Sequence, residues 1–377
     1  MSMKTTAKVR EFARKARGFA RALITRTLEF EFERMPYRLE GISNTKLLTL
    51  FRQELNCARP SSKPPWYPVQ LQIEPSSACD LHCNLCPAGM GKGGVMPFST
   101  LRALIDEVGD HAIMAIFWMW GEPFVNPKLP DMIAYAKSKN MGTVTSTNGQ
   151  HVQTKEDAER LVASGLDSIF VATDGATQES YGQYRIGGDL QKVIRCIDLI
   201  RRAKASLGSE TPRVNVRTVV TRHNEHELPE IERIARQHGA DVVSRKTACV
   251  LDYSRSDKED QFAPENAFYR RYEYRNGKRV IKPASNYRCR RIWNRITLAS
   301  DGTMVPCEFD HSRIAALGRY EEGSTFMQIW KGERAATFRR QFTINRMVYP
   351  FCMDCPLRDR LQSECTIEVL KLGNQEA

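Results

Sequence analysis

The sequence feature that most constrains the fold of this chain is a regular alternation of strand-like and helix-like segments between residues 69 and 247. The strand-like runs are Val69–Ser76, Ala115–Trp120, Thr143–Thr147, Ser168–Thr173, Val214–Thr221 and Asp241–Thr247. The amphipathic segments between them are Ser99–Val108, Leu129–Lys139, Lys155–Ser164, Leu190–Ala205 and Glu227–Gln237. Six strands alternating with helices predict an α/β fold with a parallel sheet, in which functional side chains gather at the C-terminal ends of the strands.

Eleven cysteines in 377 residues are more than core packing requires. No apolar run reaches the roughly 18 residues that cross a bilayer, and the basic N-terminus lacks the apolar core of a secretory signal. We therefore expect a cytoplasmic protein without a transmembrane segment. Because disulfides are rare in that compartment, most of these cysteines are expected to bind a metal or a cluster.

Three further regions surround the alternating one, which we place at residues 69–250. Residues 1–68 are predicted to form a basic, mainly helical extension, 251–282 a polar linker or lid, and 283–377 a small cysteine-containing domain. The apolar residues of the first helix fit either packing on the body, with a solvated basic face, or a surface for an acidic partner or an anionic membrane. The formal charge of +12 favours an anionic partner only weakly, and we expect no nucleic acid.

The first cysteine set follows directly after the first predicted strand. Cys79, Cys83 and Cys86 have spacings of three and two intervening residues on one loop. Three thiolates so placed can bind three irons of a [4Fe–4S] cubane and leave the fourth iron without a protein ligand. A structural zinc knuckle is the alternative, but the loop offers no fourth ligand nearby.

This spacing resembles the signature of the radical S-adenosylmethionine (SAM) superfamily. The resemblance implies a partial (β/α)6 TIM-like barrel, SAM bound at the open iron, a 5′-deoxyadenosyl radical as the reactive species and an external electron donor of the flavodoxin or ferredoxin type. Gly121, Glu122 and Pro123 resemble the family motif that meets the SAM amino group, although Trp120 replaces its first glycine. A carboxylate such as Glu122 suits a cationic ammonium.

The same resemblance implies further SAM contacts. Leu85 lies where the family places an apolar residue against adenine. Ser146 and Asn148 end the third strand, and Thr173 and Asp174 end the fourth, where family members hold the ribose and carboxylate. Arg217 on the fifth strand is a candidate for the SAM carboxylate or the substrate, with a surface position as the alternative.

The second cysteine set lies in the last region. Cys289, Cys307, Cys352 and Cys355 supply four thiolates, which by themselves fit either structural zinc or an iron–sulfur cluster. Their spacing resembles the SPASM/twitch extension of radical SAM enzymes, which implies one auxiliary [4Fe–4S] cluster with every iron ligated by protein. The chain departs from the complete SPASM pattern because only Cys365 follows Cys355, and we treat Cys365 as a bystander.

Three cysteines lie outside both sets and the tail. Cys57 and Cys196 have helical surroundings, where a small buried apolar side chain is the usual explanation. Cys249 follows the sixth strand, at the edge where the substrate is expected. It is either an ordinary core or loop cysteine or a catalytic thiol that donates a hydrogen atom to a substrate radical.

These features predict a radical SAM oxidoreductase acting on a small polar molecule such as a sugar, an aminocyclitol or a natural-product intermediate, with the auxiliary cluster accepting an electron. An epimerase that uses Cys249 is the close alternative. A maturase acting on a peptide or protein is less favoured, because the extension shows no strand pattern for a leader-binding domain. A non-catalytic iron–sulfur or zinc protein would leave the βα units unexplained.

Overall fold

The computed structural model describes residues 17–58, 60–86, 93–249, 261–275, 278–281, 289–353, 355 and 366–372. Most of the predicted N-terminal helix, parts of the predicted linker and Cys365 lie outside these residues. Within them, no helix is long and apolar enough to span a bilayer.

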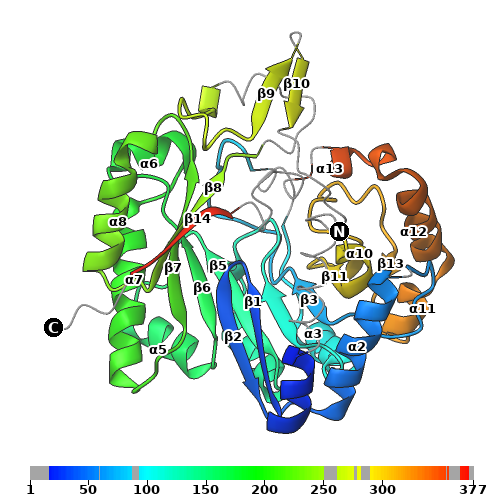
Figure 1. Cartoon of the computed structure of the whole chain (residues 1–377). Coiled ribbons are helices and arrows are strands. Elements are labelled where there is room, and N and C mark those ends of the chain that lie inside the picture. Colours follow the sequence, from blue (N-terminus) through cyan, green and yellow to red (C-terminus); the bar gives the residue numbers. More distant parts are fainter. Residues whose placement is uncertain are drawn as a thin grey trace.

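The six predicted parallel strands form the centre of the molecule (Figure 1). They are β3 (Gln70–Ile73), β4 (Met114–Phe117), β5 (Gly142–Thr147), β6 (Ser168–Ala172), β7 (Arg213–Val220) and β8 (Val242–Thr247). Each strand pairs in parallel with the next one along the chain, so their C-terminal ends share one edge. The predicted partial (β/α)6 barrel is confirmed.

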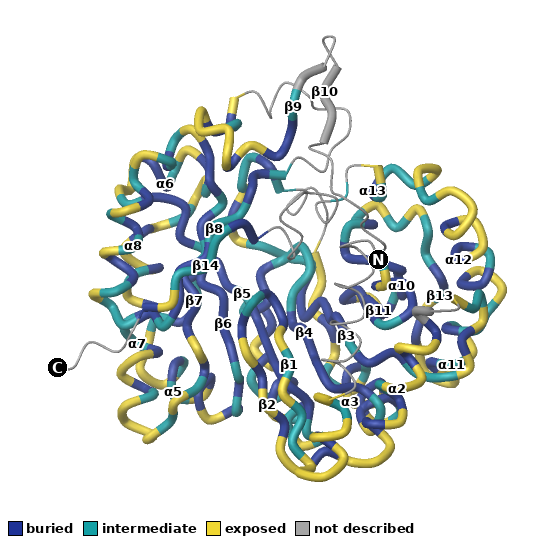
Figure 2. The backbone as a smooth tube through the Cα atoms, in the orientation of Figure 1, coloured by how far each residue is buried: buried dark blue, intermediate teal, exposed yellow. Residues whose placement is uncertain are grey.

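Helices between the strands cover the outer face of this sheet. They are α3 (Phe98–Val108), α4 (Leu129–Ser138), α5 (Lys155–Ala163), α6 (Gln178–Tyr184), α7 (Leu190–Ser206) and α8 (Leu228–Gln237), and α6 was not predicted. Local chemistry explains where they begin: Thr154 and Asp157 form a capping box at α5, and Asp189 accepts two backbone N–H groups at α7. Side chains such as Leu71, Phe117 and Val171 pack against them in the main core. The strands are accordingly buried along most of their length (Figure 2).

The inner face of the barrel is filled by a hairpin from the N-terminal extension. Strands β1 (Thr27–Phe32) and β2 (Met35–Glu40) pair antiparallel around Glu33 and Arg34, which both have positive φ. Phe32, Met35, Tyr37 and Leu39 pack with inward-facing residues of the sheet such as Phe170. The prediction of a mainly helical extension without a strand pattern was therefore wrong for this segment. The alternation of apolar residues in TLEFEF and MPYRLE was the missed signal.

Both ends of the six-stranded sheet are extended by later parts of the chain. At one end β11 (Arg295–Leu298) pairs in parallel with β3, followed by β12 (Thr303–Val305) and β13 (Gly318–Arg319). At the other end β14 (Thr366–Lys371) pairs antiparallel with β8. The last region thus contributes strands to both ends of the barrel sheet. Pairing of both edges satisfies backbone groups that an open barrel would leave exposed.

The other described elements surround this sheet (Figure 1). Helix α2 (Asn44–Ala58) follows the N-terminal hairpin. Within the predicted linker, β9 (Tyr272–Arg275) and β10 (Lys278–Ile281) form an antiparallel hairpin. The last region adds the helices α10 (Arg291–Asn294), α11 (Phe326–Trp330), α12 (Glu333–Asn345) and α13 (Pro350–Met353), and three short 3-10 turns complete the fold: η1 (Pro123–Val125), η2 (Glu225–Glu227) and η3 (Arg346–Val348).

Candidate active site with two cysteine sets

The first cysteine loop follows β3 and lies against the segment that follows β4. Gly121 has no space for a side chain, because a Cβ atom there would lie 2.1 Å from the Ser76 carbonyl oxygen and 2.7 Å from that of Ala78. The next residue completes the contact, since the Glu122 N–H donates to Ala78 O at 2.9 Å. The two loops are therefore held together directly before Cys79.

The other side of the cysteine loop is held by the end of α6. The N–H of His82 donates to Ile186 O, and the N–H of Asn84 donates to Tyr184 O. The Tyr184 hydroxyl interacts electrostatically with both Cys83 and Cys86, so these two thiols lie near the same ring. Burial raises the pKa of the Cys79 thiol to about 11, and Glu122 adds to the effect.

Arg185 brings a partly buried positive charge to this loop. Its Nη1 lies 3.5 Å from Cys83 Sγ, and its Nε donates to a carboxylate oxygen of Asp174. The other carboxylate oxygen of Asp174 accepts the Val219 N–H at 2.6 Å. Asp174, predicted to contact SAM, therefore holds Arg185 and β7 in this structure.

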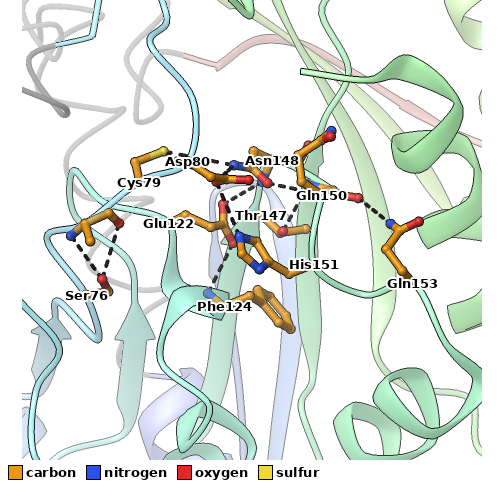
Figure 3. A network of polar contacts seen from close by, with 12 residues as sticks. Ser76, Cys79, Asp80, Glu122, Phe124, Thr147, Asn148, Gln150, His151 and Gln153 are labelled. Atoms are coloured by element: carbon orange, nitrogen blue, oxygen red, sulfur yellow. Dashed lines mark hydrogen bonds and ion pairs between the residues drawn. The ribbon is translucent and has the colours of Figure 1, made fainter. Parts of the chain in front are cut away.

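Glu122 lies at the centre of a second polar network (Figure 3). Its carboxylate accepts the backbone N–H groups of Phe124 and Asn148 at 3.2 and 2.7 Å. Burial raises the pKa of Glu122 to about 7 despite these bonds. A buried carboxylate next to the cysteine loop is suited to a ligand cation, as predicted for the SAM ammonium.

Asn148 connects this network to the cysteine loop. Its side-chain amide donates to Asp80 at 2.7 Å and lies 4.0 Å from Cys79 Sγ. His151 Nε2 lies 3.3 Å from the same Asp80 oxygen, and this contact raises the pKa of His151. Burial opposes ionisation of Asp80, but His151 and Asn148 hold its pKa below the usual value.

The remaining predicted SAM contacts are distributed along the strand ends. Pro123 begins η1 directly after Glu122. Ser146 lies on the inner face of β5, paired in register with Phe170. Thr173 is buried, and its N–H donates to Arg217 O. The structure thus places these residues at the predicted edge of the sheet.

Arg217 has partners that the sequence did not suggest. Its side chain donates to Glu33 of the N-terminal hairpin at 2.8 Å, to Ser244 at 3.1 Å and to Thr366 of β14 at 3.3 Å. It also stacks over the Phe170 ring at 3.7 Å. Arg217 therefore joins the hairpin, the barrel and the last strand. The alternative prediction, that Arg217 lies on the surface, is therefore wrong.

Cys249 lies close to the first cysteine loop. The preceding residue, Ala248, packs in a small apolar cluster with Leu85, Tyr184 and Phe262. Leu85 belongs to the cysteine loop itself, so the end of β8 reaches that loop. Cys196, by contrast, is buried in the main core, as its helical surroundings predicted.

The second cysteine set is brought together from three separate segments, which contain Cys289, Cys307 and the pair Cys352 and Cys355. Cys352 interacts electrostatically with Cys355 and Cys289, and Cys307 interacts with Cys355. Burial raises the pKa of both Cys307 and Cys352. These three interactions connect all four thiols, which fit the donor set of one iron–sulfur cluster.

Trp120 links this second set to the first. Its indole N–H donates to Glu308 O at 2.7 Å, and its ring contacts Phe309 edge-on. Glu308 follows Cys307, whereas Trp120 precedes Gly121 of the first site. The residue that departs from the family motif therefore connects the two cysteine sets.

Several site residues were missed from the sequence. Arg185 directly follows α6 and His151 lies in the loop after β5, and no spacing pattern marks either residue. Asp80 could have been found, since it is adjacent to Cys79. Among the described residues, no three His, Cys, Asp or Glu side chains could together hold one metal ion. The thiols that bind a cubane do not need to meet at one metal ion, because each thiol binds a different iron.

Two family models match the chain. The model described as the radical SAM superfamily covers residues 73–235, and the SPASM model, an iron–sulfur cluster-binding domain, covers residues 289–356. Together they cover more than half of the sequence. The cofactors of these domains are SAM with a [4Fe–4S] cluster for the first and auxiliary iron–sulfur binding for the second.

Curated relatives extend the match. The tungsten-containing aldehyde ferredoxin oxidoreductase cofactor-modifying protein of Pyrococcus furiosus is 25% identical over 336 residues, which are 81% of this chain and 92% of the relative. The mycofactocin maturase of Mycobacterium ulcerans is 31% identical over 46% of each chain. An AdoMet-dependent heme synthase of Nitratidesulfovibrio vulgaris is 30% identical over 44% of each chain.

Solved structures share the fold. Streptococcus suis SuiB bound to the precursor peptide SuiA superposes with a TM-score of 0.55 and 13% identity, over 79% of this chain and 72% of SuiB. The protein anSMEcpe with bound AdoMet gives a TM-score of 0.50 and 16% identity, over 80% of this chain and 92% of that chain. At such identities the likeness supports the architecture alone.

Proposed function

Because this chain is a radical SAM protein with a C-terminal SPASM iron–sulfur domain, we propose that it catalyses the oxidative modification of a cofactor precursor. The observation that carries the proposal is the connection of two cysteine sets through Trp120, at the C-terminal edge of one parallel sheet. A hydrogen-abstracting centre and an electron-accepting centre on the same edge suit the removal of two electrons from one substrate.

The bound groups supply the redox chemistry, namely a 5′-deoxyadenosyl radical from SAM at the first cluster and an acceptor for the substrate's second electron at the auxiliary cluster. The protein supplies binding and orientation. Glu122 offers carboxylate lone pairs to the SAM ammonium, and Leu85 offers an apolar surface to adenine. Arg185 places a positive charge at Cys83, and Asp174 holds that arginine in place.

The substrate class follows from the relatives more than from the site. The first relative, matched over most of its length, is named a cofactor-modifying protein, and others are named maturases and heme synthases. None of these names refers to a sugar or an aminocyclitol. We therefore widen the predicted small polar substrate to a precursor of an organic cofactor, either a small molecule or a peptide.

A peptide substrate gains support from the N-terminal hairpin. The sequence argument against a peptide depended on an extension without strands, and β1 and β2 remove that argument. The hairpin itself does not identify the substrate, because its apolar side chains pack inside the barrel.

The test uses anaerobically reconstituted full-length protein with SAM and dithionite, and 5′-deoxyadenosine is measured by chromatography. Formation is expected for the wild type and for Cys289→Ala, and it should be abolished by replacing Cys79, Cys83 and Cys86 with alanine. If the triple variant still cleaves SAM reductively, the assignment of the first site is wrong. Candidate substrates are then compared by the excess of 5′-deoxyadenosine that each induces.

An epimerase is the second candidate function, favoured by one observation. Ala248 packs with Leu85 of the cysteine loop, so Cys249 is near the predicted radical centre. A thiol there could return a hydrogen atom to the substrate radical on the opposite face. In deuterated water, an epimerase would place deuterium at the substrate carbon, and Cys249→Ala would abolish product. Unchanged product formation by that variant removes Cys249 from the mechanism.

A further inference from the structure

We propose that a buried group of three charges, Arg291, Glu308 and Arg295, sets the reduction potential of the auxiliary cluster, which the arginines raise and the glutamate lowers. The proposal rests on the proposed function only in taking Cys307 as a ligand of the auxiliary cluster. The charge group is defined by these three residues, and its location next to Cys307 is a property of the fold.

The three side chains contact one another inside the protein. Arg291 Nη1 forms an ion pair with Glu308 Oε1, and Arg295 Nη1 lies 3.7 Å from the same oxygen. All three are buried, with exposed fractions of 6% for Arg291, 4% for Arg295 and 8% for Glu308. Two positive charges thus surround one negative charge, and the group has a net charge of about +1.

The geometry indicates the charge of each group. An arginine side chain stays protonated in proteins, and the Glu308 carboxylate lies between two guanidinium groups, which favours its charged form.

The group lies directly beside a proposed cluster ligand. Cys307 Sγ lies 3.2 Å from Glu308 Oε2, and Cys307 also interacts electrostatically with Arg291 and Arg295. Cys307 is itself buried, at 9% exposed. Little water screens these interactions, so each charge acts on the cysteine strongly.

The direction of each effect follows from charge. Reduction adds a negative charge to a cluster that four thiolates already make anionic. A nearby cation stabilises the reduced state and raises the potential, and a nearby anion lowers it. Removal of either arginine should therefore lower the potential, and removal of the glutamate should raise it.

The contacts of Arg295 show that it is fixed in place. Its Nε donates to Gln70 Oε1 at 2.9 Å, its Nη1 donates to Gln72 Oε1 at 3.3 Å, and its guanidinium lies over the Phe32 ring. A fixed charge near the cluster costs no reorganisation when the electron arrives.

The experiment is a potentiometric titration of full-length reconstituted protein, followed by electron paramagnetic resonance. A variant with alanine at Cys79, Cys83 and Cys86 assigns the auxiliary signal. Arg295→Gln is expected to shift the auxiliary potential to more negative values, and Glu308→Gln to more positive values. Arg295→Lys keeps the charge and should stay near the wild type. Arg319→Gln is the matched control, because Arg319 is an exposed arginine of β13 in the same region.

Opposite shifts support the assignment, since a purely structural disturbance would not follow the sign of the removed charge. Shifts of the same sign for Arg295→Gln and Glu308→Gln, or no shift in either, would overturn it. Iron and sulfide content is measured for each variant, so that cluster loss is not mistaken for a change in potential. The titration needs no substrate. A negative result would therefore contradict the role of these charges without contradicting the proposed function, which is tested separately.

Discussion

Replacement of Gly121 by alanine tests how the first cysteine loop is positioned. The family resemblance assigns this glycine to SAM binding, whereas the structure gives it a steric role. A Cβ atom at residue 121 would lie 2.1 Å from Ser76 O and 2.7 Å from Ala78 O. Both obstacles are backbone atoms, and they lie within three residues of Cys79.

The size of the effect follows from these distances. Ordinary carbon contacts begin near 3.4 Å, so Ser76 or Gly121 must move by more than an ångström. Overpacking of this kind costs typically about 1–3 kcal/mol, and the upper end is expected because no flexible side chain can give way. The movement would also break the hydrogen bond from the Glu122 N–H to Ala78 O.

The assay compares Gly121→Ala with Gly94→Ala. Gly94 exchanges hydrogen bonds with Ser77 in the same region, yet a Cβ there meets nothing within 4 Å. Iron content, the free energy of unfolding and 5′-deoxyadenosine formation are measured for both. Gly121→Ala should lose the first cluster and its SAM cleavage, while Gly94→Ala stays close to the wild type.

One result would refute the steric reasoning. If Gly121→Ala keeps its full iron content and stability but binds SAM more weakly, the glycine acts through the ligand and not through the loop. An equal loss in Gly94→Ala would also contradict it, because the two substitutions differ only in the space available.

Three further predictions concern buried charges. Burial raises the pKa of Glu122 in the folded protein to about 7, above its ordinary 4.5. Between pH 4.5 and 7 the folded protein therefore keeps a proton on Glu122 that the unfolded chain has lost. The free energy of unfolding should therefore fall by about 3 kcal/mol as pH rises from 4.5 to 7, and Glu122→Gln should remove this dependence in denaturant titrations of the apoprotein. Arg185→Gln removes the positive charge beside the Cys83 thiol and should therefore lower the reduction potential of the first cluster in a potentiometric titration. Arg185→Lys should give an intermediate potential. Glu33→Gln should lower the free energy of unfolding by about 3 kcal/mol, since Arg217 then lacks its carboxylate; the exposed Glu29→Gln is the control.

Each of these has a contrary outcome. A pH dependence that survives in the Glu122 variant would assign the titration to another group. A potential that rises in Arg185→Gln would contradict the proposed effect of its charge. Equal stability of the Glu33 and Glu29 variants would show that the buried pair contributes no more than a surface one.

The strands, the helices and the first cysteine set could be recognised from local sequence patterns. The βα units could be predicted because side-chain periodicity follows from strand and helix geometry, as in the alternation around Val214–Thr221. The first cysteine set was recognisable because its three thiols lie within eight residues, and loop spacing alone limits what they can bind. Asp80 follows Cys79 directly and could have been identified in the same way, but it was overlooked.

The contacts that complete the site depend on pairs far apart in the chain. Arg217 meets Glu33 and Thr366, Trp120 meets Glu308, and Arg185 meets Cys83, across separations of about one hundred residues or more. No local pattern encodes such pairs, because they arise only when sheet pairing brings distant segments together. Periodicity and spacing therefore determined the barrel and the grouping of its cysteines, whereas the tertiary structure decided which charges and rings surround those cysteines.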